Sequence, residues 1–244
     1  MSIAGQEQRQ RRRPSKGPRA RTFQAMLDGT MRLMQSGVMP SVSDVAEAAQ
    51  VSRATAYRYF PSQAALVQAA VDEALGPIFG WRSEDGDVEA RVSDLFGFAY
   101  PQIQAHEATH RAALLMALDQ WTRRQAGTLG DEERIVRGNR RGLLELATVT
   151  AKSPLGPAAR KRLAQSLSLL FGIESIIVLK DIWGLDDTGA AEIAAWAATA
   201  LVRAALAEQA PAPDTSKASD QDGTMRPSHL GERTGLRRAA RRTG

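Results

Sequence analysis

Hydrophobic residues recur at helical spacing along most of the chain, and no stretch shows the alternation of a β-strand. Turn-forming residues separate the periodic runs, notably Gly37, Gly76-Pro77 and a Gly, Asp and Ser-rich linker over 77–86. We therefore predict an all-α fold, in which Pro101 bends or ends its helix. The predicted helices cover residues 21–35, 41–49, 53–59, 62–76, 88–103, 107–124, 132–152, 157–183 and 187–208.

Two of these helices are short and are joined by a tight turn within Ser41–Phe60. Ser41 and Asp44 can form a capping box at the start of the first helix, and Ser52 can cap the second. About three residues lie between the two helices. This spacing is typical of the helix-turn-helix, which places its second helix in the major groove of DNA.

The second of these helices has two chemically different sides. At 100° per residue, Ala56 and Phe60 share an apolar side, while Ala54 and Arg58 point away from it. An exposed arginine can make a bidentate contact to guanine, and an alanine methyl can contact the thymine methyl. An ordinary helical hairpin with a solvated polar face has the same spacing, so the neighbouring sequence must decide.

Together with residues 21–37 before it and 61–70 after it, this stretch resembles the DNA-binding domain of the tetracycline-repressor (TetR) family. Four residues depart from the family pattern: Gln50, Ala56, Tyr59 and Gln63 stand where glycine, leucine, histidine and lysine are usual. A positive φ at Gln50 would cost roughly 1 kcal/mol. The matching positions are Ser41, Asp44-Val45-Ala46, Ala48-Ala49, Val51-Ser52, Thr55, Tyr57, Phe60 and Leu66.

The resemblance implies which side chains touch DNA. Hydroxyl groups and the basic arm are expected at phosphates, and the exposed side of the second helix is expected at base edges. The predicted DNA-binding residues are Arg19, Arg21, Ser41, Ser43, Ser52, Arg53, Ala54, Thr55, Tyr57, Arg58, Tyr59 and Gln63.

Composition divides the chain into four parts. Residues 1–18 are predicted to be a disordered basic arm, 19–76 the DNA-binding domain, 77–210 an effector-binding and dimerisation domain, and 211–244 a disordered basic tail. Residues 1–22 carry seven Lys and Arg against one Glu, whereas the whole chain has a net charge of +5. The two ends therefore hold the positive surplus, which fits contact with a polyanion, although a solvated tail with no role fits as well.

Composition also excludes several classes of protein. A chain of 244 residues with 43% hydrophobic residues can bury a sizeable core. It contains no cysteine, which excludes disulfides, thiolate metal sites and cysteine nucleophiles. No run of eighteen apolar residues occurs, and no apolar segment follows the basic N-terminus. We expect a cytoplasmic protein without a membrane partner.

The C-terminal half is expected to dimerise and to bind a small molecule. Residues 163–183 are apolar on nearly every side, and 187–208 are alanine-rich, which suits an isologous four-helix interface in a homodimer. The resemblance implies an effector that releases DNA by shifting the helix after the DNA-binding domain. A buried Glu174 would need a partner. Candidate pocket residues are Phe98, His110, Met116, Trp121, Phe171 and Glu174.

One motif points to a different function. His106-Glu107-Ala108-Thr109-His110 has the H-E-x-x-H spacing of zinc metalloproteases. A third ligand is needed, and residues 111–114 do not begin the extended form of the motif. We therefore predict no enzyme activity, no metal and no cofactor. The predicted function is a homodimeric repressor that binds a palindromic operator and is released by a small effector; an effector-independent architectural DNA-binding protein, which should lack a cavity, is the other alternative.

Overall fold

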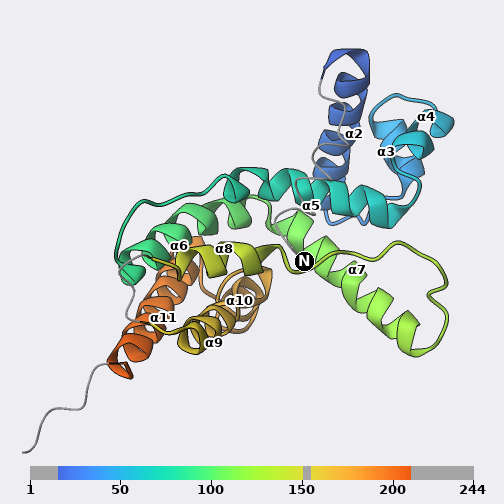
Figure 1. The fold of residues 1–244 in the computed structure, drawn as a ribbon. Helices are drawn as coiled ribbons and strands as arrows, with labels where there is room; N and C mark the ends of the chain where they lie inside the picture. The colour runs from blue at the N-terminus through green and yellow to red at the C-terminus, as the bar shows by residue number, and fades with distance from the viewer. Residues whose placement is uncertain (1–15, 151–154, 210–244) are drawn as a thin grey trace, which may run out of the picture. The chain divides into compact units, whose positions relative to one another are not determined.

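The computed structural model describes residues 16–150 and 155–209, and every regular element in this part of the chain is helical (Figure 1). This confirms the predicted all-α fold. Most of the predicted basic arm and the predicted tail lie outside the described residues. The elements are α2 (Gly17–Gln35), α3 (Val42–Ala48), α4 (Arg53–Tyr59), α5 (Gln63–Phe79), α6 (Val88–Ala105), α7 (Glu107–Gln125), α8 (Asn139–Ala147), α9 (Pro157–Leu167), α10 (Ile173–Ile177), the π-helical η1 (Val178–Ile182) and α11 (Asp187–Ala207).

The first hydrophobic core lies among α2, α3, α4, α5 and α7, where Met26, Val45 and Leu66 are fully buried. Helix α4 has only seven residues and is too short to be stable by itself. Ala56 and Phe60 anchor it, with 1% and 2% of their surfaces exposed. The apolar side predicted for α4 is therefore the side that packs, and the opposite side is free.

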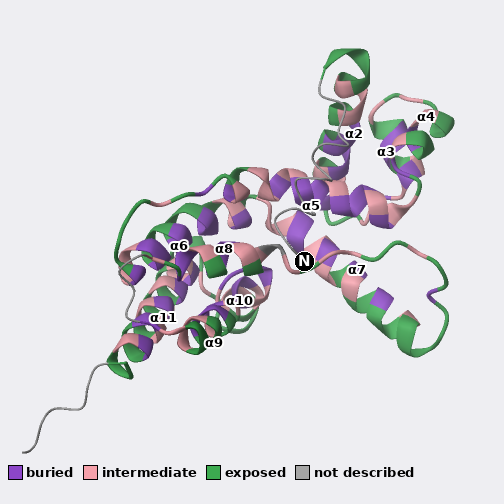
Figure 2. Ribbon diagram, viewed as in Figure 1, coloured by how far each residue is buried: buried purple, intermediate pink, exposed green. Residues whose placement is uncertain are grey.

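A second core lies among α6, α8, α9, α10 and α11. The rings of Phe96 and Phe171 meet edge to face with centroids 5.2 Å apart, and the Tyr100 hydroxyl lies 2.9 Å from Ser175 Oγ. Helix α11 packs most extensively on α6, and its small side chains at Ala194 and Ala198 allow a close approach. Figure 2 shows these buried positions alternating with exposed ones along α11.

Helix α5 belongs to both cores and does not end where the sequence predicts. It continues through Gly76 and Pro77 to Phe79, although proline removes one helical hydrogen bond. Ile78 is completely buried in the second core, and Leu75 packs against both cores. The burial of these side chains offsets the local cost of Pro77. The predicted domain boundary at residues 76 and 77 thus falls inside a continuous helix.

Pro101 also lies inside a helix, because α6 continues past it to Ala105. Of the two predicted alternatives, the helix does not end at Pro101, and a bend there stays a prediction. The linker between α5 and α6, from Gly80 to Asp87, is fixed at Trp81. The indole N–H of Trp81 donates to Asp94 at 2.7 Å, and the residue is only 4% exposed. The linker is therefore anchored to α6 by a buried aromatic side chain.

Two long continuous helices were predicted wrongly. As far as residue 150, the described part of the run 132–152 contains only α8, because residues 126–138 form a loop held by side chains of α5 and α7. The run over 157–183 is interrupted after α9, where Gly172 has a φ of +133°. Apolar periodicity continues through both interruptions, so the pattern alone does not reveal them.

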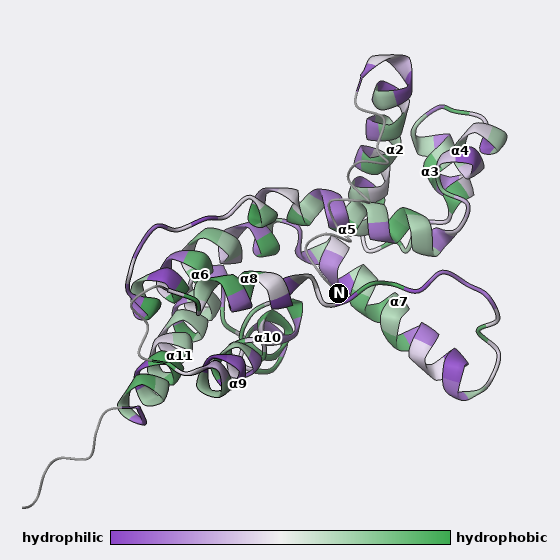
Figure 3. Ribbon diagram, viewed as in Figure 1, coloured by the Kyte–Doolittle hydropathy of each residue, from purple (hydrophilic) through white to green (hydrophobic). Residues whose placement is uncertain are grey.

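Several large apolar side chains remain exposed on η1 and α11. Ile182, Trp183 and Trp196 are 73%, 72% and 71% exposed, so the segment 163–183 is not buried on all sides within one chain. Figure 3 shows that α11 is mostly hydrophobic. By length and hydropathy α11 could cross a membrane, but core helices of soluble proteins pass the same test, and α11 packs on α6 and α9.

Candidate nucleic-acid interface and ligand pocket

The helix-turn-helix is built as the sequence predicts. Ser41 and Asp44 form the capping box: Asp44 N–H donates to Ser41 Oγ at 3.1 Å, and Ser41 N–H donates to the Asp44 carboxylate at 2.8 Å. The hydrogen bonds from the Ser41 main chain and side chain, together with the charge of Arg53, hold the pKa of Asp44 below its ordinary value against a small opposing effect of burial. Gln50 has a φ of +55°, so the residue that replaces the usual glycine is in the left-handed region.

The exposed side of α4 carries the side chains expected at base edges. Arg53, Ala54, Tyr57 and Arg58 are all exposed, and Tyr57 is 48% exposed despite its aromatic ring. No acidic residue occurs between Glu47 and Asp72 in the sequence. A large phenol ring and two guanidinium groups on a short exposed helix that itself contains no carboxylate suit an anionic, hydrogen-bonding partner.

The amino end of α2 lies beside the carboxyl end of α4. The Phe23 ring centroid is 6.2 Å from that of Tyr59, and the Tyr59 hydroxyl donates to the carbonyl of Arg19 at 3.4 Å. The guanidinium carbon of Arg58 is 5.9 Å from the Tyr59 ring centroid. Arg19 and Arg21 are exposed on the first turns of α2. The basic residues of two separate helices therefore adjoin through Tyr59.

Several predicted contact residues also have structural partners within the protein. Ser52 Oγ accepts from the Thr55 N–H and donates to Thr55 Oγ1 at 2.9 Å, which caps α4. Gln63 Nε2 donates to the carbonyl of Pro40 at 2.9 Å and so joins α5 to the segment before α3. Ser43 is partly buried on α3. Gln63 therefore fixes the helix-turn-helix onto α5 where the family usually has a lysine.

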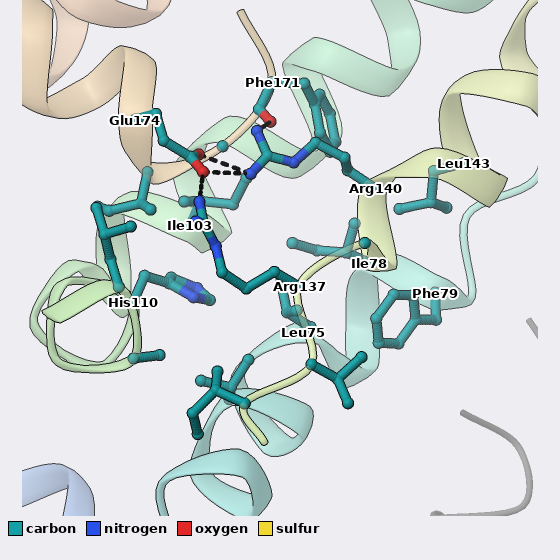
Figure 4. A pocket seen from close by; sticks show the side chains of 18 residues that line it. Leu75, Ile78, Phe79, Ile103, His110, Arg137, Arg140, Leu143, Phe171 and Glu174 are labelled. Atoms are coloured by element: carbon teal, nitrogen blue, oxygen red, sulfur yellow. Dashed lines mark hydrogen bonds and ion pairs between the residues drawn. The ribbon is translucent and has the colours of Figure 1, made fainter. Parts of the chain in front are cut away.

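A cavity of about 100 Å³ lies between α5, α6, α7, α8 and the residues that precede and begin α10 (Figure 4). Leu75, Ile78, Phe79, Ile103 and Leu143 form its apolar walls. Three of the predicted pocket residues, His110, Phe171 and Glu174, line it. The other three lie elsewhere: Phe98 and Trp121 are 43% and 56% exposed, and Met116 is buried in the first core.

Glu174 has the cationic partners that its position requires. Arg140 donates to both carboxylate oxygens at 2.6 and 2.7 Å, and Arg137 donates to one of them (Figure 4). Arg140 also donates to the carbonyls of Ser168 and Phe171, which fixes its guanidinium. Burial raises the pKa of Glu174, but Arg140 and Arg137 outweigh it and hold that pKa below the ordinary value.

Gly172 makes this ion pair possible. A Cβ at this position would lie 3.0 Å from Arg140 Nη1 and 3.1 Å from a Glu174 oxygen, and its φ of +133° disfavours any other residue. Sequence reasoning missed Arg137 and Arg140. The signal for them was the need of a buried carboxylate for a cation, but the charged stretch 131–141 also contains Arg134 and Arg141, so the sequence does not single out Arg137 and Arg140.

His110 lines the same pocket and is buried, with 7% of its surface exposed. Its Nε2 has no hydrogen-bond partner among the described residues. Burial, together with the nearby His106, lowers the pKa of His110 to about 4 although Glu174 acts in the opposite direction, so the imidazole is neutral near pH 7. Figure 4 shows its ring directed toward the side chain of Arg137.

The H-E-x-x-H motif is not arranged as a metal centre in the described structure. His106 lies at the junction between α6 and α7, and Glu107 pairs with Arg111 and Lys180 at 2.7 and 2.6 Å. Residues 16–150 and 155–209 contain no cluster of three or more His, Asp or Glu side chains suited to a metal. The carboxylate that a protease would use as general base is thus held in ion pairs.

The loop between α7 and α8 joins the pocket to α5. The Val136 N–H donates to Gln68 Oε1 at 2.7 Å, and the Ile135 N–H donates to Gln120 Oε1 at 2.9 Å. Ile135, Val136 and Arg137 all line the pocket. One loop therefore carries a pocket arginine and a hydrogen bond to the helix that also holds the helix-turn-helix.

Part of the sequence matches a known family of proteins. Residues 26–70 match the family described as bacterial regulatory proteins, tetR family. Among solved structures, a TetR transcriptional regulator from Rhodococcus sp. RHA1 is similar to this chain, with 21% sequence identity over 77% of this chain and 97% of that chain and a TM-score of 0.47. No curated protein matches the sequence.

Proposed function

We propose that this chain, which belongs to the TetR family of DNA-binding transcriptional regulators through its residues 26–70, is a cytoplasmic repressor. In this proposal it binds a palindromic operator as a homodimer and is released when a small effector enters the pocket. The single observation that carries the proposal is the exposed side of α4, with Arg53, Tyr57 and Arg58 displayed on a helix whose other side is fully packed.

DNA recognition divides between two groups of residues. Arg53, Ala54 and Arg58 face outward on α4, where they can reach base edges in the major groove. Arg19 and Arg21 on α2 lie beside the carboxyl end of α4, so they suit phosphates that flank the same groove. The first group supplies sequence preference and the second supplies affinity that depends on salt.

The effector response is proposed to act through α5. Helix α5 carries Gln63, which holds the helix-turn-helix, and Leu75 and Ile78, which line the pocket. A ligand that moves the pocket walls must also act on this helix. A change in the direction of α5 would alter the separation of the two recognition helices in a dimer, which must match half-sites about 34 Å apart or a multiple of that distance.

Dimerisation is proposed to cover the exposed apolar side chains of η1 and α11. Ile182, Trp183, Ile193 and Trp196 are large and between 46% and 73% exposed in one chain. An isologous interface brings the same residues from two copies together and removes this surface from water. Effector-independent architectural binding is the weaker alternative, because the structure contains a pocket connected to α5.

The test is selection of genomic DNA fragments by the purified protein, followed by footprinting. We expect a palindromic protected site. A double variant Arg53→Ala/Arg58→Ala should lose selection, whereas Arg162→Ala, which removes an exposed arginine of α9, should retain it. Selection of the same fragments by the double variant would exclude α4 as the reading element.

A further inference from the structure

The pocket beside α5 contains an unbalanced set of polar groups. Arg137 and Arg140 supply two positive charges, and Glu174 supplies one negative charge. No other ionised side chain lines the cavity, because the pKa of His110 is lowered to about 4. The described pocket therefore has one cationic charge more than it can neutralise, and a charge held in a partly buried, apolar site favours a counter-ion.

The two arginines are not equivalent. The guanidinium of Arg140 is already engaged in hydrogen bonds, because it donates to two main-chain carbonyls and to both oxygens of Glu174. Within the described residues, Arg137 donates only to Glu174, and its side chain is 42% exposed at the edge of the cavity. A guanidinium has five N–H groups, so Arg137 retains donors for a second acceptor.

A second donor lines the same cavity, with its ring directed toward Arg137 (Figure 4). His110 is 93% buried, lines the same cavity, and has an Nε2 without a partner among the described residues. A buried ring nitrogen without a hydrogen bond costs free energy that an acceptor inside the pocket would recover. The neutral imidazole can carry its proton on Nε2 and donate it.

The geometry points to a ligand of defined chemistry. We propose that the pocket binds a small organic monoanion, a carboxylate on a short aliphatic chain, and that Arg137 and His110 hold the carboxylate. The aliphatic chain lies against Leu75, Ile78, Ile103 and Leu143. The inference rests on the proposed function, in which this pocket is the effector site.

The size of the cavity limits the chain length. A cavity of roughly 150 Å³ holds a benzene ring in an engineered protein, and this one measures about 100 Å³. A ligand of about three to five carbons fits without rearrangement of the walls. The bound carboxylate shares Arg137 with Glu174, which shifts the guanidinium toward the ligand and moves the loop that carries it.

The experiment is calorimetric and thermal-shift titration of the full-length protein with sodium acetate, propionate, butyrate and valerate at constant ionic strength. The amides of the same acids serve as neutral controls. We expect carboxylates of three to five carbons to bind and to raise the melting temperature, with the corresponding amides at least about tenfold weaker. Equal binding of acids and amides, or no binding of any acid, would overturn the proposal.

Two matched variants test the residues. Arg137→Met should weaken carboxylate binding at least about tenfold, because it removes the half-exposed donor and leaves the Arg140–Glu174 pair intact. Arg141→Met is the control: it removes an arginine of α8 that is 69% exposed and pairs with Glu145. A third variant, His110→Leu, removes the second donor and should also weaken carboxylate binding. If it does not fold, the Arg137 variant decides. Unchanged carboxylate binding by Arg137→Met would overturn the assignment.

Release of DNA is measured separately on fragments selected by the wild-type protein. Carboxylate binding that leaves the DNA complex intact would support the ligand chemistry and contradict the effector-controlled release. DNA binding without any carboxylate binding would overturn the ligand assignment and leave the DNA-binding function in place. The two proposals can therefore fail independently.

Discussion

The main-chain N–H of Val136 donates to the side-chain oxygen of Gln68 at 2.7 Å, which joins the pocket loop to helix α5. Gln68 is 5% exposed, and its Nε2 donates to Asp72 at 3.0 Å. Arg137 follows Val136 directly and contacts Glu174 across the pocket. In the proposed function, a displacement of Arg137 by a ligand would be transmitted to α5 through this one buried side chain.

Replacement of Gln68 should disconnect the pocket from DNA binding. Gln68→Met keeps the approximate volume but removes both hydrogen bonds, so we expect a stability loss of about 1–3 kcal/mol from the unsatisfied groups. The variant should bind operator DNA like the wild type while its release by the effector is reduced at least about tenfold. Fluorescence anisotropy of labelled operator with and without effector measures both quantities.

Gln120→Met is the control for this experiment. Gln120 holds the same loop from α7 through Ile135 and Glu133, so its loss loosens the loop without cutting the bond to α5. It should destabilise the protein and retain the effector response. Equal loss of response in both variants would show that loop rigidity, and not the Gln68 bond, carries the coupling.

Gln50→Gly should stabilise the protein. Gln50 has a φ of +55°, a conformation that costs a residue with a Cβ roughly 1–2 kcal/mol and costs glycine little. Glycine loses more backbone entropy on folding, so the net gain should be about 1 kcal/mol. Urea unfolding measures it, with Gln50→Ala as control, which should show no gain. An unchanged urea midpoint in Gln50→Gly would mean that the turn is not strained.

The helix-turn-helix could be predicted closely because its signals are local. The capping box at Ser41 and Asp44, the cap at Ser52 and the apolar pair Ala56 and Phe60 each act within one or two turns of helix, and all three features are present. Helix ends that depend on distant packing were not predictable. Pro77 remains helical only because Ile78 is buried in a core formed mostly by residues after 88.

The pocket was predictable in part. Glu174 was identified because a carboxylate in an apolar helix needs a partner, and the partners proved to be Arg137 and Arg140. The sequence predicted a continuous helix over 132–152. The loop that carries Arg137 and precedes Arg140 on α8 was therefore not predicted. Exposed aromatic residues such as Trp121 have the same spacing as core residues, so periodicity does not distinguish a pocket wall from a surface.

Acid should destabilise the protein through His110. Well above pH 6.5 the imidazole is neutral in both the folded and the unfolded state, so it contributes nothing to the pH dependence there. As the pH falls from 6.5 toward 4, only the unfolded state takes up the proton, because the folded pKa is about 4. The expected loss is on the order of 3 kcal/mol over this range.

The measurement is the free energy of unfolding of the wild type and of His110→Leu at several pH values. His106 and Glu174 are the titratable groups that act on His110, and both remain in the variant. The lowered pKa of Glu174 adds its own loss of stability in acid to both proteins. The difference between the two curves therefore reports His110, and parallel curves between pH 6.5 and 4 would contradict its assigned burial.

Arg58 and Arg19 should contribute to DNA binding in different ways. Arg58→Ala is expected to cost about 1–3 kcal/mol at one base position and to relax preference there. Arg19→Ala should weaken binding to all sequences similarly and reduce the slope of log affinity against log salt by about 1. Binding titrations on a set of single-base operator variants at several salt concentrations separate the two effects. A uniform loss for Arg58→Ala would place that side chain at the phosphates.

Trp196→Glu should prevent dimerisation while leaving the monomer folded. Trp196 is 71% exposed in one chain, so its replacement there should change stability by no more than about 0.5 kcal/mol. In an isologous interface two new carboxylates would be buried near each other, which costs several kcal/mol per ion. We expect monomers in analytical ultracentrifugation at micromolar concentration and at least about a hundredfold loss of affinity for a palindromic operator.

Leu115→Glu, on the exposed side of α7, is the control and should remain dimeric. If Trp196→Glu sediments as a dimer and Leu115→Glu does not, the interface lies on α7 and the exposed face of α11 has another role.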